Sequence, residues 1–484
     1  MNTAVSYLPG AAPASNSVTA DIRRVFDLQR ETALRLRTST AKERIAKIQK
    51  LHDVVMAYRE QIYEAAYKDF KKPPAEVDLA EILPVIGEAK HAMRKLKKWM
   101  KPAGVMPTSL TIGLKSWVQF EPKGRCLIVS PWNYNVNLCF SPLVSCIAAG
   151  NTAILKPSEM TPHLSALMAK MIKEIFPVDE VALFEGDVEV STALLALPFD
   201  HIFFTGSPAV GKVVMAAAAK HLTSVTLELG GKSPTIIDET ADLKLAAQTL
   251  LWGKYTNNGQ TCIAPDYVYV HATVKDAFVK ECVAVIESNY GKSAAEQMNS
   301  PYLARVVNQR HTKRINALLT DARDRGARIL CGGEANENEC FIQPTLLDNI
   351  PADAKIQSEE IFGPLLPIMA YSDLDQVINA INAEQKPLAL YIWSKNEANI
   401  EKALKRTSAG GTCINHCVVQ YVHGNLPFGG VNNSGIGSAH GHYGFRAFSH
   451  ERAVVRTRFM MARMLFPPYT NFKSKLVNIM LKTQ

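Results

Sequence analysis

The sequence predicts two α/β domains, each built on a doubly wound parallel sheet. The length, the composition and the order of apolar runs together predict this class. A chain of 484 residues is too long for one hydrophobic core. Its 47% hydrophobic and 20% charged residues are ordinary for a soluble globular protein. Strand-like and helix-like segments alternate along most of the chain, as in parallel sheets covered by helices on both faces.

The chain begins with a segment that lacks any periodic pattern. Residues 1–19 are rich in Ala, Ser, Asn and Pro, and no charged segment precedes an apolar run. We therefore expect a disordered lead-in rather than a signal peptide. Apolar positions at helical spacing predict helices over 21–70. The same spacing over 75–101 predicts one long helix that ends in a basic run before Pro102.

The first α/β series runs from residue 126 to residue 220. Its predicted strands are 126–130, 152–155, 181–184 and 201–204, and its predicted helices are one ending at Ala149, one beginning near Pro162, 191–197 and 210–220. Upstream, apolar residues on either side of a Pro-Lys-Gly turn predict further strands over 117–128. Ligands of doubly wound sheets bind beyond the carboxyl ends of the strands. The loops that fall at that edge here are 131–134, 156–159 and 205–211.

A second α/β series occupies residues 230–420. Its predicted strands lie near 234–237, 267–270, 365–371, 389–393 and 411–414. Its predicted helices lie near 243–258, 274–289, 301–326, 374–384 and 397–406. We therefore divide the chain into a Rossmann-like cofactor-binding domain (20–229, with arm strands at 115–124), a catalytic domain (230–422), a returning segment with one further strand (423–460) and a basic tail (461–484).

The cysteines indicate a reducing compartment. None of the nine forms a CxxC pair, and their number is odd. Cys126, Cys139, Cys146 and Cys282 stand among apolar residues, as buried reduced thiols do. This pattern favours the cytoplasm over an oxidising compartment, and it predicts neither a disulfide framework nor a metal site.

The net charge of +9 is unevenly distributed. Basic residues gather over 94–101 and in the tail, where no acidic residue follows Glu451. No nucleic-acid-binding module or aromatic platform accompanies them, so we expect no nucleic-acid partner. No apolar run reaches the roughly 20 residues that span a bilayer.

A cysteine and a carboxylate are the first candidates for catalysis. Cys262 ends the run Gly259-Gln260-Thr261-Cys262, and Glu228 stands upstream in Leu227-Glu228-Leu229-Gly230-Gly231-Lys232. A thiolate is the strongest nucleophile that a side chain offers near neutral pH, and a carboxylate can prepare water for attack. A cysteine is also commonly a small buried apolar side chain, and the pair alone leaves both interpretations open.

Three loops are candidates for cofactor binding. The run Gly206–Gly211 follows a strand and opens a helix, so its backbone could approach a pyrophosphate, although the spacing is not GxGxxG. Lys156-Pro157-Ser158-Glu159 also follows a strand and could bind ribose hydroxyls. Glu360-Ile361-Phe362 could hold a second sugar from the other domain. Each could equally be a helix start or a turn without a ligand.

These motifs, in this order, resemble the aldehyde dehydrogenase superfamily over residues 20–460. The resemblance is carried by Pro131-Trp132-Asn133, Lys156-Pro157-Ser158-Glu159, Phe204-Thr205-Gly206-Ser207, Glu228–Lys232, Gly259–Cys262, Glu360-Ile361-Phe362-Gly363-Pro364 and Pro427-Phe428-Gly429-Gly430. Further segments look most similar to the class 3 and coniferyl aldehyde dehydrogenase branch: Trp132-Asn133-Tyr134, Cys262–Tyr267, His440–Phe445, Phe448-Ser449-His450 and Pro467-Pro468-Tyr469. Asn135 departs from the family, where Pro commonly stands, and we expect it beside the substrate channel.

The resemblance implies a fold and a chemistry. The fold is two doubly wound α/β domains with an oligomerisation arm, formed by strands near 117–122 and 452–458. Cys262 would attack the aldehyde, the Asn133 amide and the Cys262 N–H would bind the oxyanion, and Glu228 would activate water to release the acid. Relatives that pass the acyl group to CoA or phosphate generally lack this Glu, so Glu228 favours hydrolysis. A scaffold without activity is disfavoured, because Cys262, Glu228 and Asn133 are all present.

The resemblance also implies the cofactor and its contacts. Trp132 and the loop of Gly206, Ser207, Val210 and Gly211 would flank the pyrophosphate. Lys156, Ser158 and Glu159 would hold the adenine ribose, and Glu360 with Phe362 the nicotinamide ribose. Glu159 should repel a 2′-phosphate and favour NAD, although class 3 enzymes with a similar motif accept NADP as well.

The substrate and the partners follow from the same branch. We expect a coniferyl-type aromatic aldehyde, with medium- or long-chain aliphatic aldehydes as the alternative. A homodimer is expected, and a tetramer is the alternative. The tail could contact anionic lipid or pack over the substrate funnel or a second subunit, and we favour packing. Its apolar residues are Phe459, Leu465, Phe466, Leu476, Ile479, Met480 and Leu481.

Overall fold

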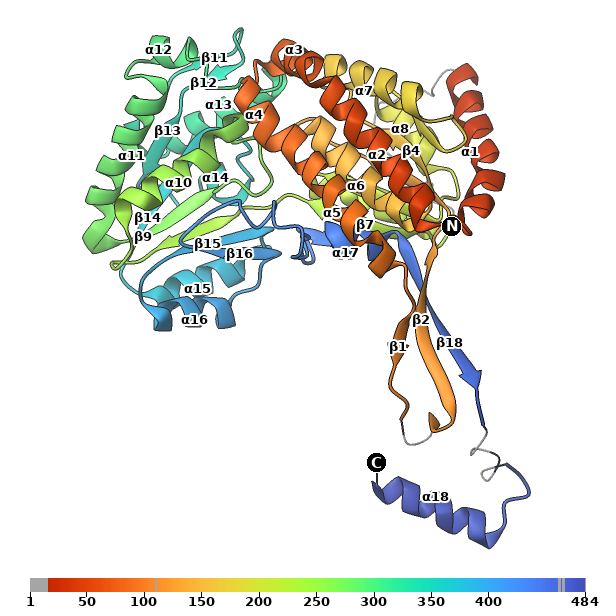
Figure 1. The fold of residues 1–484 in the computed structure, drawn as a ribbon. Helices are drawn as coiled ribbons and strands as arrows, with labels where there is room; N and C mark the ends of the chain where they lie inside the picture. The colour runs from red at the N-terminus through yellow and green to blue at the C-terminus, as the bar shows by residue number, and fades with distance from the viewer. Residues whose placement is uncertain (1–15, 109–110, 460–462, 464–465, 484) are drawn as a thin grey trace, which may run out of the picture.

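The computed structural model describes residues 16–108, 111–459, 463 and 466–483. Of the predicted disordered lead-in, residues 1–15 lie outside the described residues, and residues 16–19 are helical rather than disordered. Helices, two sheets and a narrow arm make up the described chain (Figure 1). All nine cysteines are free, and Cys126, Cys139, Cys146 and Cys282 are buried, as their apolar neighbours predict.

The N-terminal layer is helical, as the spacing over 21–70 predicts. It contains α1 (Asn16–Leu36), α2 (Ala41–Ala57) and α3 (Arg59–Phe70). A capping box between Thr40 and Glu43 starts α2, because each side chain accepts a hydrogen bond from a backbone N–H of the other residue. Helix α1 packs directly on strands of the first sheet, whereas α2 and α3 pack mainly on other helices.

The single helix predicted over 75–101 is interrupted. The segment forms α4 (Pro74–Val77), a π-helical turn η1 (Asp78–Ile82) and α5 (Leu83–Trp99). The π-helical turn brings Glu81 to full burial against Lys72. A π-helical turn inside an α-helix is rare and frequently lies at a functional site.

The first sheet has six strands in the order β17-β7-β6-β3-β4-β5. The predicted strands are present as β3 (Arg125–Val129), β4 (Thr152–Lys156), β5 (Val181–Leu183) and β6 (His201–Gly206), all parallel. Two strands were not predicted, β7 (Ser224–Leu229) and the short antiparallel β17 (Gly435–Ile436). The covering helices are α6 (Asn135–Ala149), α7 (Pro162–Ile175), α8 (Val188–Leu195) and α9 (Pro208–Ala219). This is a doubly wound α/β unit, as predicted.

The second sheet has seven strands in the order β10-β13-β14-β9-β8-β15-β16. Its predicted strands are β8 (Pro234–Ile237), β9 (Tyr267–His271), β14 (Leu365–Tyr371), β15 (Ala389–Trp393) and β16 (Gly411–Ile414). Two further strands, β10 (Arg328–Cys331) and β13 (Thr345–Asp348), extend one edge, and β11 (Ala335–Asn336) pairs separately with β12 (Phe341–Ile342). The helices are α10 (Leu243–Tyr255), α11 (Lys275–Tyr290), α14 (Lys355–Ser358), α15 (Leu374–Ala383) and α16 (Glu397–Arg406), with short 3-10 turns η3 (Thr256–Gly259) and η4 (Ala272–Val274).

The helix predicted over 301–326 is shorter than expected. After α12 (Ala294–Met298), the chain is irregular until α13 (Gln309–Asp324). Asn308 is the reason for the late start, because its side chain accepts a hydrogen bond from His311 N and caps the helix there. Apolar residues of the irregular segment, such as Leu303 and Val306, are buried without forming a helix.

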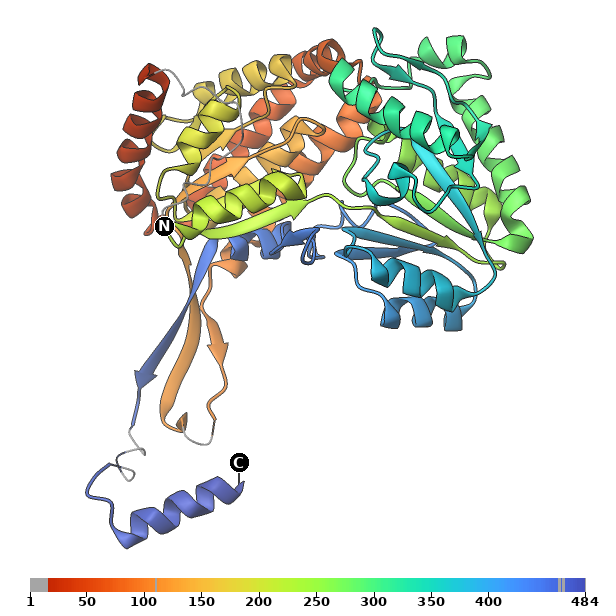
Figure 2. The ribbon, with the colours of Figure 1, turned by 180° about the vertical axis from the view of Figure 1, so that it is seen from behind.

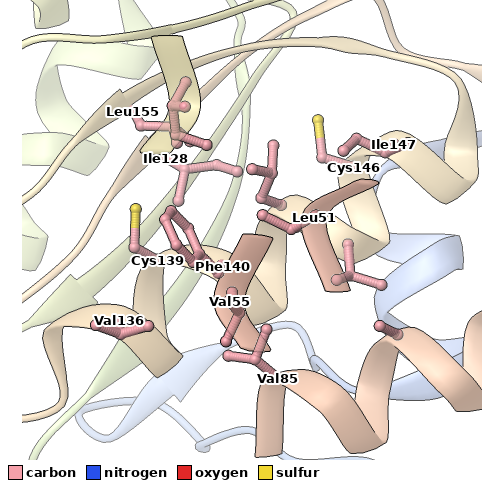
Figure 3. Close-up of a cluster of buried hydrophobic side chains, with 14 of the residues drawn as sticks. Leu51, Val55, Val85, Ile128, Val136, Cys139, Phe140, Cys146, Ile147 and Leu155 are labelled. Carbon is pink, nitrogen blue, oxygen red and sulfur yellow. The ribbon is translucent and has the colours of Figure 1, made fainter. Parts of the chain in front are cut away.

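The largest buried cluster joins the helical layer to the first sheet. Figure 3 shows its centre, where Phe140 of α6 lies among side chains of α2, α5 and the strands. Labelled members are Leu51, Val55, Val85, Ile128, Val136, Cys139, Cys146, Ile147 and Leu155. Because α6 is buried on nearly all sides, its N-terminus is held firmly at the carboxyl edge of the sheet.

A narrow three-stranded arm extends from the body (Figures 1 and 2). It contains β1 (Ala103–Val105), β2 (Leu114–Pro122) and β18 (Ser449–Thr457), in the order β1-β2-β18. The nine-residue antiparallel pairing of β18 with β2 is the one predicted for the arm. Before β18 comes the short helix α17 (Gly441–Ala447), which packs on α6 and α5.

The tail ends in helix α18 (Asn471–Thr483), beyond the tip of the arm (Figure 1). Of the predicted apolar tail residues, Leu465 lies outside the described residues. The described part of the tail does not pack over the substrate funnel of its own chain, because α18 lies beyond the arm and away from the body (Figure 1). None of the helices in the described ranges is long and apolar enough to cross a membrane.

Candidate active site

A cavity of about 290 Å³ lies at the carboxyl edge of the first sheet. Loops from both sheets line it, as expected for a doubly wound fold. It brings together eight of the thirteen predicted site residues: Trp132, Asn133, Gly206, Ser207, Glu228, Cys262, Glu360 and Phe362. The predicted nucleophile, base and oxyanion donor therefore share one cavity with the loops proposed for cofactor binding.

Cys262 follows a loop of unusual backbone. Asn257, Asn258 and Gly259 all have positive φ, at 54°, 56° and 76°. A side chain at Gly259 could not fit, because a Cβ there would lie 2.3 Å from the carbonyl oxygen of Gly363. Strained backbone of this kind persists only where the surroundings fix it, and it gathers at functional sites.

Side-chain amides hold this loop in place. The Gln260 amide donates to the carbonyls of Asn257 and Arg305, both at 2.9 Å, and its oxygen accepts from Val307 N at 2.9 Å. Asn258 donates to the Ala304 carbonyl at 2.6 Å. The irregular segment before α13 thus supports the residues that precede Cys262.

The environment of Cys262 favours its neutral thiol. Burial is the main cause, and the carboxyls of Glu360 and Glu228 add to it, so that the pKa of the thiol rises to about 12. Its ordinary value is near 9. A thiolate at this position therefore requires a base or a nearby positive charge.

Glu228 reaches the cavity from regular structure. It lies near the carboxyl end of β7, paired with Thr205 of β6 and Gly435 of β17. Its side chain is buried, and neither carboxyl oxygen has a hydrogen-bond partner. Burial holds the pKa of the Glu228 carboxyl well above its usual value. A buried, unpartnered carboxyl with a raised pKa is suited to general-base catalysis.

Asn133 stands two residues before α6 and is almost fully buried. Its side-chain amide donates to the Gln260 carbonyl at 2.9 Å. Since an amide nitrogen carries two hydrogens, one remains for a substrate oxygen. The Asn133 carbonyl accepts in turn from the Asn257 amide at 2.9 Å. Asn133 is thus tied directly to the loop that carries Cys262.

The glycine loop after β6 approaches its neighbours closely. A Cβ at Gly206 would lie 2.5 Å from the Phe204 ring, and one at Gly211 would lie 2.6 Å from Leu229. Ser207 caps α9, and no acidic residue stands in the first turn of that helix. The free N–H groups and positive dipole end of α9 are suited to a pyrophosphate.

Aromatic side chains and a carboxyl from the second sheet complete the cavity. The rings of Trp132 and Phe362 meet edge to face, with centroids 5.5 Å apart. Glu360 accepts a hydrogen bond from Gly231 N at 3.2 Å. Burial, followed by the charge of Asp266, raises the pKa of Glu360 to about 8. The Glu360 carboxyl lies close to the backbone at Gly230, since a Cβ at that position would be 2.4 Å from a Glu360 oxygen.

Five predicted cofactor residues lie outside the lining of this cavity: Lys156, Ser158, Glu159, Val210 and Gly211. Lys156 and Glu159 form an ion pair at 3.1 Å at the end of β4, the strand next to β3. Glu159 keeps 40% of its side chain exposed. These groups therefore stand at the same sheet edge as the cavity but further along it.

The donors at this edge fit a nicotinamide dinucleotide. A helix N-terminus without acidic residues suits its diphosphate, Glu360 suits a ribose diol, and Trp132 with Phe362 offers flat apolar surface. Within the described ranges, no group of three or more His, Cys, Asp or Glu side chains could hold a metal ion.

A second cavity of about 140 Å³ reaches Cys262 from the other side. Its lining is mainly apolar, and it includes Leu79, Ala80, Pro84, Leu138, Trp252, Ile263, Val418, Val419 and Val422. Glu76 also lines it and accepts a hydrogen bond from Asn257 N at 2.8 Å. Burial raises the pKa of Glu76 to about 7. This cavity has the character of an entry channel for an apolar substrate.

The expectation for Asn135 is wrong. Its amide donates to Thr161 at 2.8 Å and to Ser165 at 3.1 Å, and it lines neither cavity. The residue after Tyr134 begins α6, whose first turn faces the loop before α7, and the side chain is drawn to the hydroxyls there.

Several site residues were not found from the sequence. Tyr134 contacts the Thr261 hydroxyl at 2.6 Å, and Tyr421 donates to Asn137 at 3.0 Å. Both tyrosines line the channel next to Cys262. The pair Asn257-Asn258 before Gly259 does carry a signal, since Asn tolerates left-handed backbone better than most residues.

Comparison with known proteins places the chain among related sequences. Residues 11–454 match the profile described as "Aldehyde dehydrogenase family". The chain is 48% identical to the "putative aldehyde dehydrogenase" AldX of Bacillus subtilis, over 90% of the chain and 98% of the relative. It is 42% identical to a "probable coniferyl aldehyde dehydrogenase" of Caulobacter vibrioides (89% and 90%) and 41% identical to the "4,4'-diaponeurosporen-aldehyde dehydrogenase" of Staphylococcus aureus (87% and 91%).

Solved structures agree with the sequence matches. The substrate-bound state of Staphylococcus aureus AldH matches with a TM-score of 0.90 and 39% identity, over 95% of this chain and 99% of that chain. A Mycobacterium tuberculosis aldehyde dehydrogenase complexed with NAD⁺ matches with a TM-score of 0.82 and 26% identity, over 90% of each chain.

Proposed function

The chain belongs to the aldehyde dehydrogenase family, an enzyme family that oxidises small aldehydes with a nicotinamide cofactor, and we propose that it does so through Cys262, Asn133 and Glu228. The observation that carries this proposal is the single cavity shared by a thiol, an amide donor and an unpartnered carboxyl. We propose the division into domains at 20–229, 230–422 and 423–460 with the tail 461–484 on the same basis, since each sheet supplies one part of the cavity.

The first step forms a bond between the Cys262 sulfur and the aldehyde carbon. The thiol must lose its proton, and the carboxylate of Glu228 is a base near enough to raise the pKa of Cys262 by its charge. The electron pair of the C=O bond moves to oxygen, and the product is a thiohemiacetal. The Asn133 amide and the Cys262 N–H stabilise the oxyanion, and one such donor contributes about 3–4 kcal/mol.

The second stage releases the acid. When bound, the nicotinamide supplies the acceptor for the hydride that leaves the substrate carbon. Loss of that hydride leaves a thioester on Cys262. Glu228 first releases to solvent the proton that it took from Cys262. It then takes a proton from a water molecule as the water oxygen attacks the thioester carbon, and the Cys262 sulfur departs as a thiolate as the acid forms. General-base catalysis of this kind contributes on the order of 10²–10⁴-fold.

We propose NAD as the preferred cofactor, with NADP as the alternative. Trp132, Gly206 and Ser207 would flank the diphosphate, with Val210 and Gly211 in the first turn of α9 behind them. Glu360 and Phe362 would hold the nicotinamide ribose, and Lys156, Ser158 and Glu159 the adenine ribose. The exposed carboxylate of Glu159 would repel a 2′-phosphate, although its ion pair with Lys156 weakens that repulsion.

We propose a coniferyl-type aromatic aldehyde as the substrate. The Caulobacter vibrioides relative supports this choice, and so does Glu76, a hydrogen-bond acceptor for a phenol in a mainly apolar channel. The alternative, a medium- or long-chain aliphatic aldehyde, is supported by the apolar lining itself. We propose a homodimer joined through the arm, because β18 is an exposed edge strand, with a tetramer as the alternative. The free cysteines support a cytoplasmic location.

Initial rates test the function and the substrate together. Coniferaldehyde, benzaldehyde, hexanal and decanal are compared, each with NAD and with NADP, by formation of the reduced cofactor. We expect acid formation from every active substrate and the highest kcat/KM with coniferaldehyde and NAD. A higher kcat/KM for decanal would select the aliphatic alternative, and the absence of reduced cofactor with all four would overturn the function.

A further inference from the structure

A buried ion pair outside the catalytic groups lies beside the oxyanion donor. Lys72 and Glu81 both have side chains that are 0% exposed, and Lys72 Nζ lies 2.8 Å from Glu81 Oε1. Removing two charges from water is costly, and their mutual attraction offsets that cost only when the remaining donors and acceptors are also satisfied. The further partners of both groups therefore show what the pair is attached to.

Apart from the Phe70 ring, whose centre lies 5.4 Å away, the remaining partners of the Lys72 ammonium belong to the segment Asn133-Tyr134. The ammonium donates to the Asn133 carbonyl at 3.2 Å and lies 4.1 Å from the centre of the Tyr134 ring. Asn257, from the loop before Cys262, donates to the same Asn133 carbonyl. The Asn133 backbone is thus held between the ammonium on one side and the cysteine loop on the other.

The second oxygen of Glu81 holds the start of α6. It accepts a hydrogen bond from Asn137 N at 3.0 Å, in the first turn of that helix. The Asn137 side chain accepts in turn from Tyr421, which lines both cavities. Glu81 comes from the π-helical turn η1, whose extra residue per turn explains how it reaches inward from an otherwise amphipathic helix.

We propose that the Lys72–Glu81 pair positions the oxyanion donor. It fixes the Asn133 backbone and the first turn of α6, so that the Asn133 amide keeps its place relative to the Cys262 N–H. The inference rests on the roles proposed above for Asn133 and Cys262. Lys72 and Glu81 are positioning residues, since they act through Asn133 and line neither cavity.

The double variant Lys72→Met/Glu81→Leu separates positioning from stability. A single substitution would leave a buried unpaired charge and could prevent folding, whereas replacing both groups by apolar side chains of similar size is often neutral for stability. We expect the melting temperature to fall by no more than about 5 °C. We expect kcat to fall about 10- to 100-fold, because a small displacement of a catalytic donor has effects of that size.

Two further measurements identify the step affected. Hydrolysis of p-nitrophenyl acetate forms an acyl group on Cys262 through an oxyanion but transfers no hydride, so its rate should fall by the same factor. The Kd for NAD should be unchanged. The control is Lys275→Met/Asp348→Leu, which removes another ion pair, with 2.7 Å between Lys275 Nζ and Asp348 Oδ2. Asp348 is buried and neither residue lines either cavity, while Arg328, the other partner of Asp348, is 61% exposed and stays solvated. The kcat of this control variant should equal that of the unaltered protein.

A mutant cycle that combines Asn133→Ala with Lys72→Met/Glu81→Leu tests the inference. If the pair acts through Asn133, Asn133→Ala lowers kcat by a smaller factor in the double variant than in the unaltered chain. Independent, multiplying factors would overturn the inference, and so would a double variant with full kcat while Asn133→Ala is impaired. If Asn133→Ala itself keeps full kcat, the role proposed for Asn133 is wrong, and the positioning inference fails with it.

Discussion

The two catalytic candidates are held at the cavity by different structures: Glu228 by a strand within a sheet, and Cys262 by an irregular loop. Glu228 stands near the end of β7, between two hydrogen-bonded strands, and its carboxyl has no polar partner. Cys262 follows three residues with positive φ, and its loop is held by side-chain amides. A strand fixes its residues through the sheet, so Glu228 can remain unpartnered and basic. A loop needs added hydrogen bonds to reach the same precision.

Substitution of Cys262, the catalytic candidate on the loop, should lower the oxidation rate the most. In Cys262→Ser, a weaker nucleophile replaces the thiol, and we expect the oxidation rate to fall by on the order of 10⁴-fold or more. NAD binding should persist, since most of the proposed cofactor residues lie on loops of the first sheet, and titration calorimetry measures it. Full residual turnover would contradict covalent catalysis at Cys262.

The variant Glu228→Gln tests the residue that is held by the strand. It keeps the shape of the side chain and removes its basicity. We expect steady-state turnover to fall about 10²- to 10⁴-fold. A rapid burst of reduced cofactor should remain in stopped-flow absorbance if Glu228 acts mainly in hydrolysis of the thioester. Loss of the burst would instead show that Glu228 is needed to deprotonate Cys262.

The pH profile supplies the control for that variant. A general base works only when deprotonated, and burial raises the pKa of Glu228 above its usual value of 4.5. In the unaltered protein kcat should therefore rise with pH through a limb that lies well above pH 4.5. Glu228→Gln should lack that limb, and its persistence would assign the titration to another group.

The strain in the cysteine loop is tested by Gly259→Ala. The added methyl group meets the Gly363 carbonyl, and φ at this position is +76°. We expect kcat to fall about 10- to 100-fold through displacement of Cys262. The matched control is Gly326→Ala, where φ is +111° and a Cβ meets nothing within 4 Å. Gly326→Ala should change the melting temperature, because alanine is strained at this positive φ, and it should leave kcat unchanged.

The smallest change in kinetics is expected at Glu159, which lies on neither the strand of Glu228 nor the loop of Cys262. Glu159→Gln removes the exposed carboxylate of the Lys156 pair and leaves the cavity intact. We expect the ratio of kcat/KM for NADP to that for NAD to rise about two- to fivefold, the scale of a surface charge interaction. An unchanged ratio would place the adenine ribose elsewhere.

The sequence predicted most of the fold because its signals are local. Apolar runs followed by turns identified β3, β4, β5 and β6 of the first sheet, and β8, β9, β14, β15 and β16 of the second. β7 was missed although its polar and apolar residues alternate, and its pairing with β6 on one edge and the distant β17 on the other is not visible in the local sequence. The helix predicted to 258 ends at Tyr255, because the next residues adopt a backbone set by distant partners.

The site was predicted as motifs rather than as geometry. The motifs located Cys262, Glu228 and Asn133, the residues for which we propose direct roles in the chemistry. Lys72 and Glu81 could not be found in the same way. A lysine before two prolines and a glutamate in an amphipathic helix are ordinary surface residues by sequence, and only the π-helical turn and the packing of α6 bring them together.

The pairing of β17 with β7 has a consequence for biosynthesis. β7 ends at Leu229, whereas its outer neighbour begins at Gly435, after the whole second sheet. During translation the first sheet is therefore made with one edge uncovered, and that edge includes Glu228. An open edge strand can pair with another chain. Nascent chains released before residue 435 should aggregate or bind chaperones. Pairing of the free edge of β7, the strand that carries Glu228, is therefore among the last events of folding.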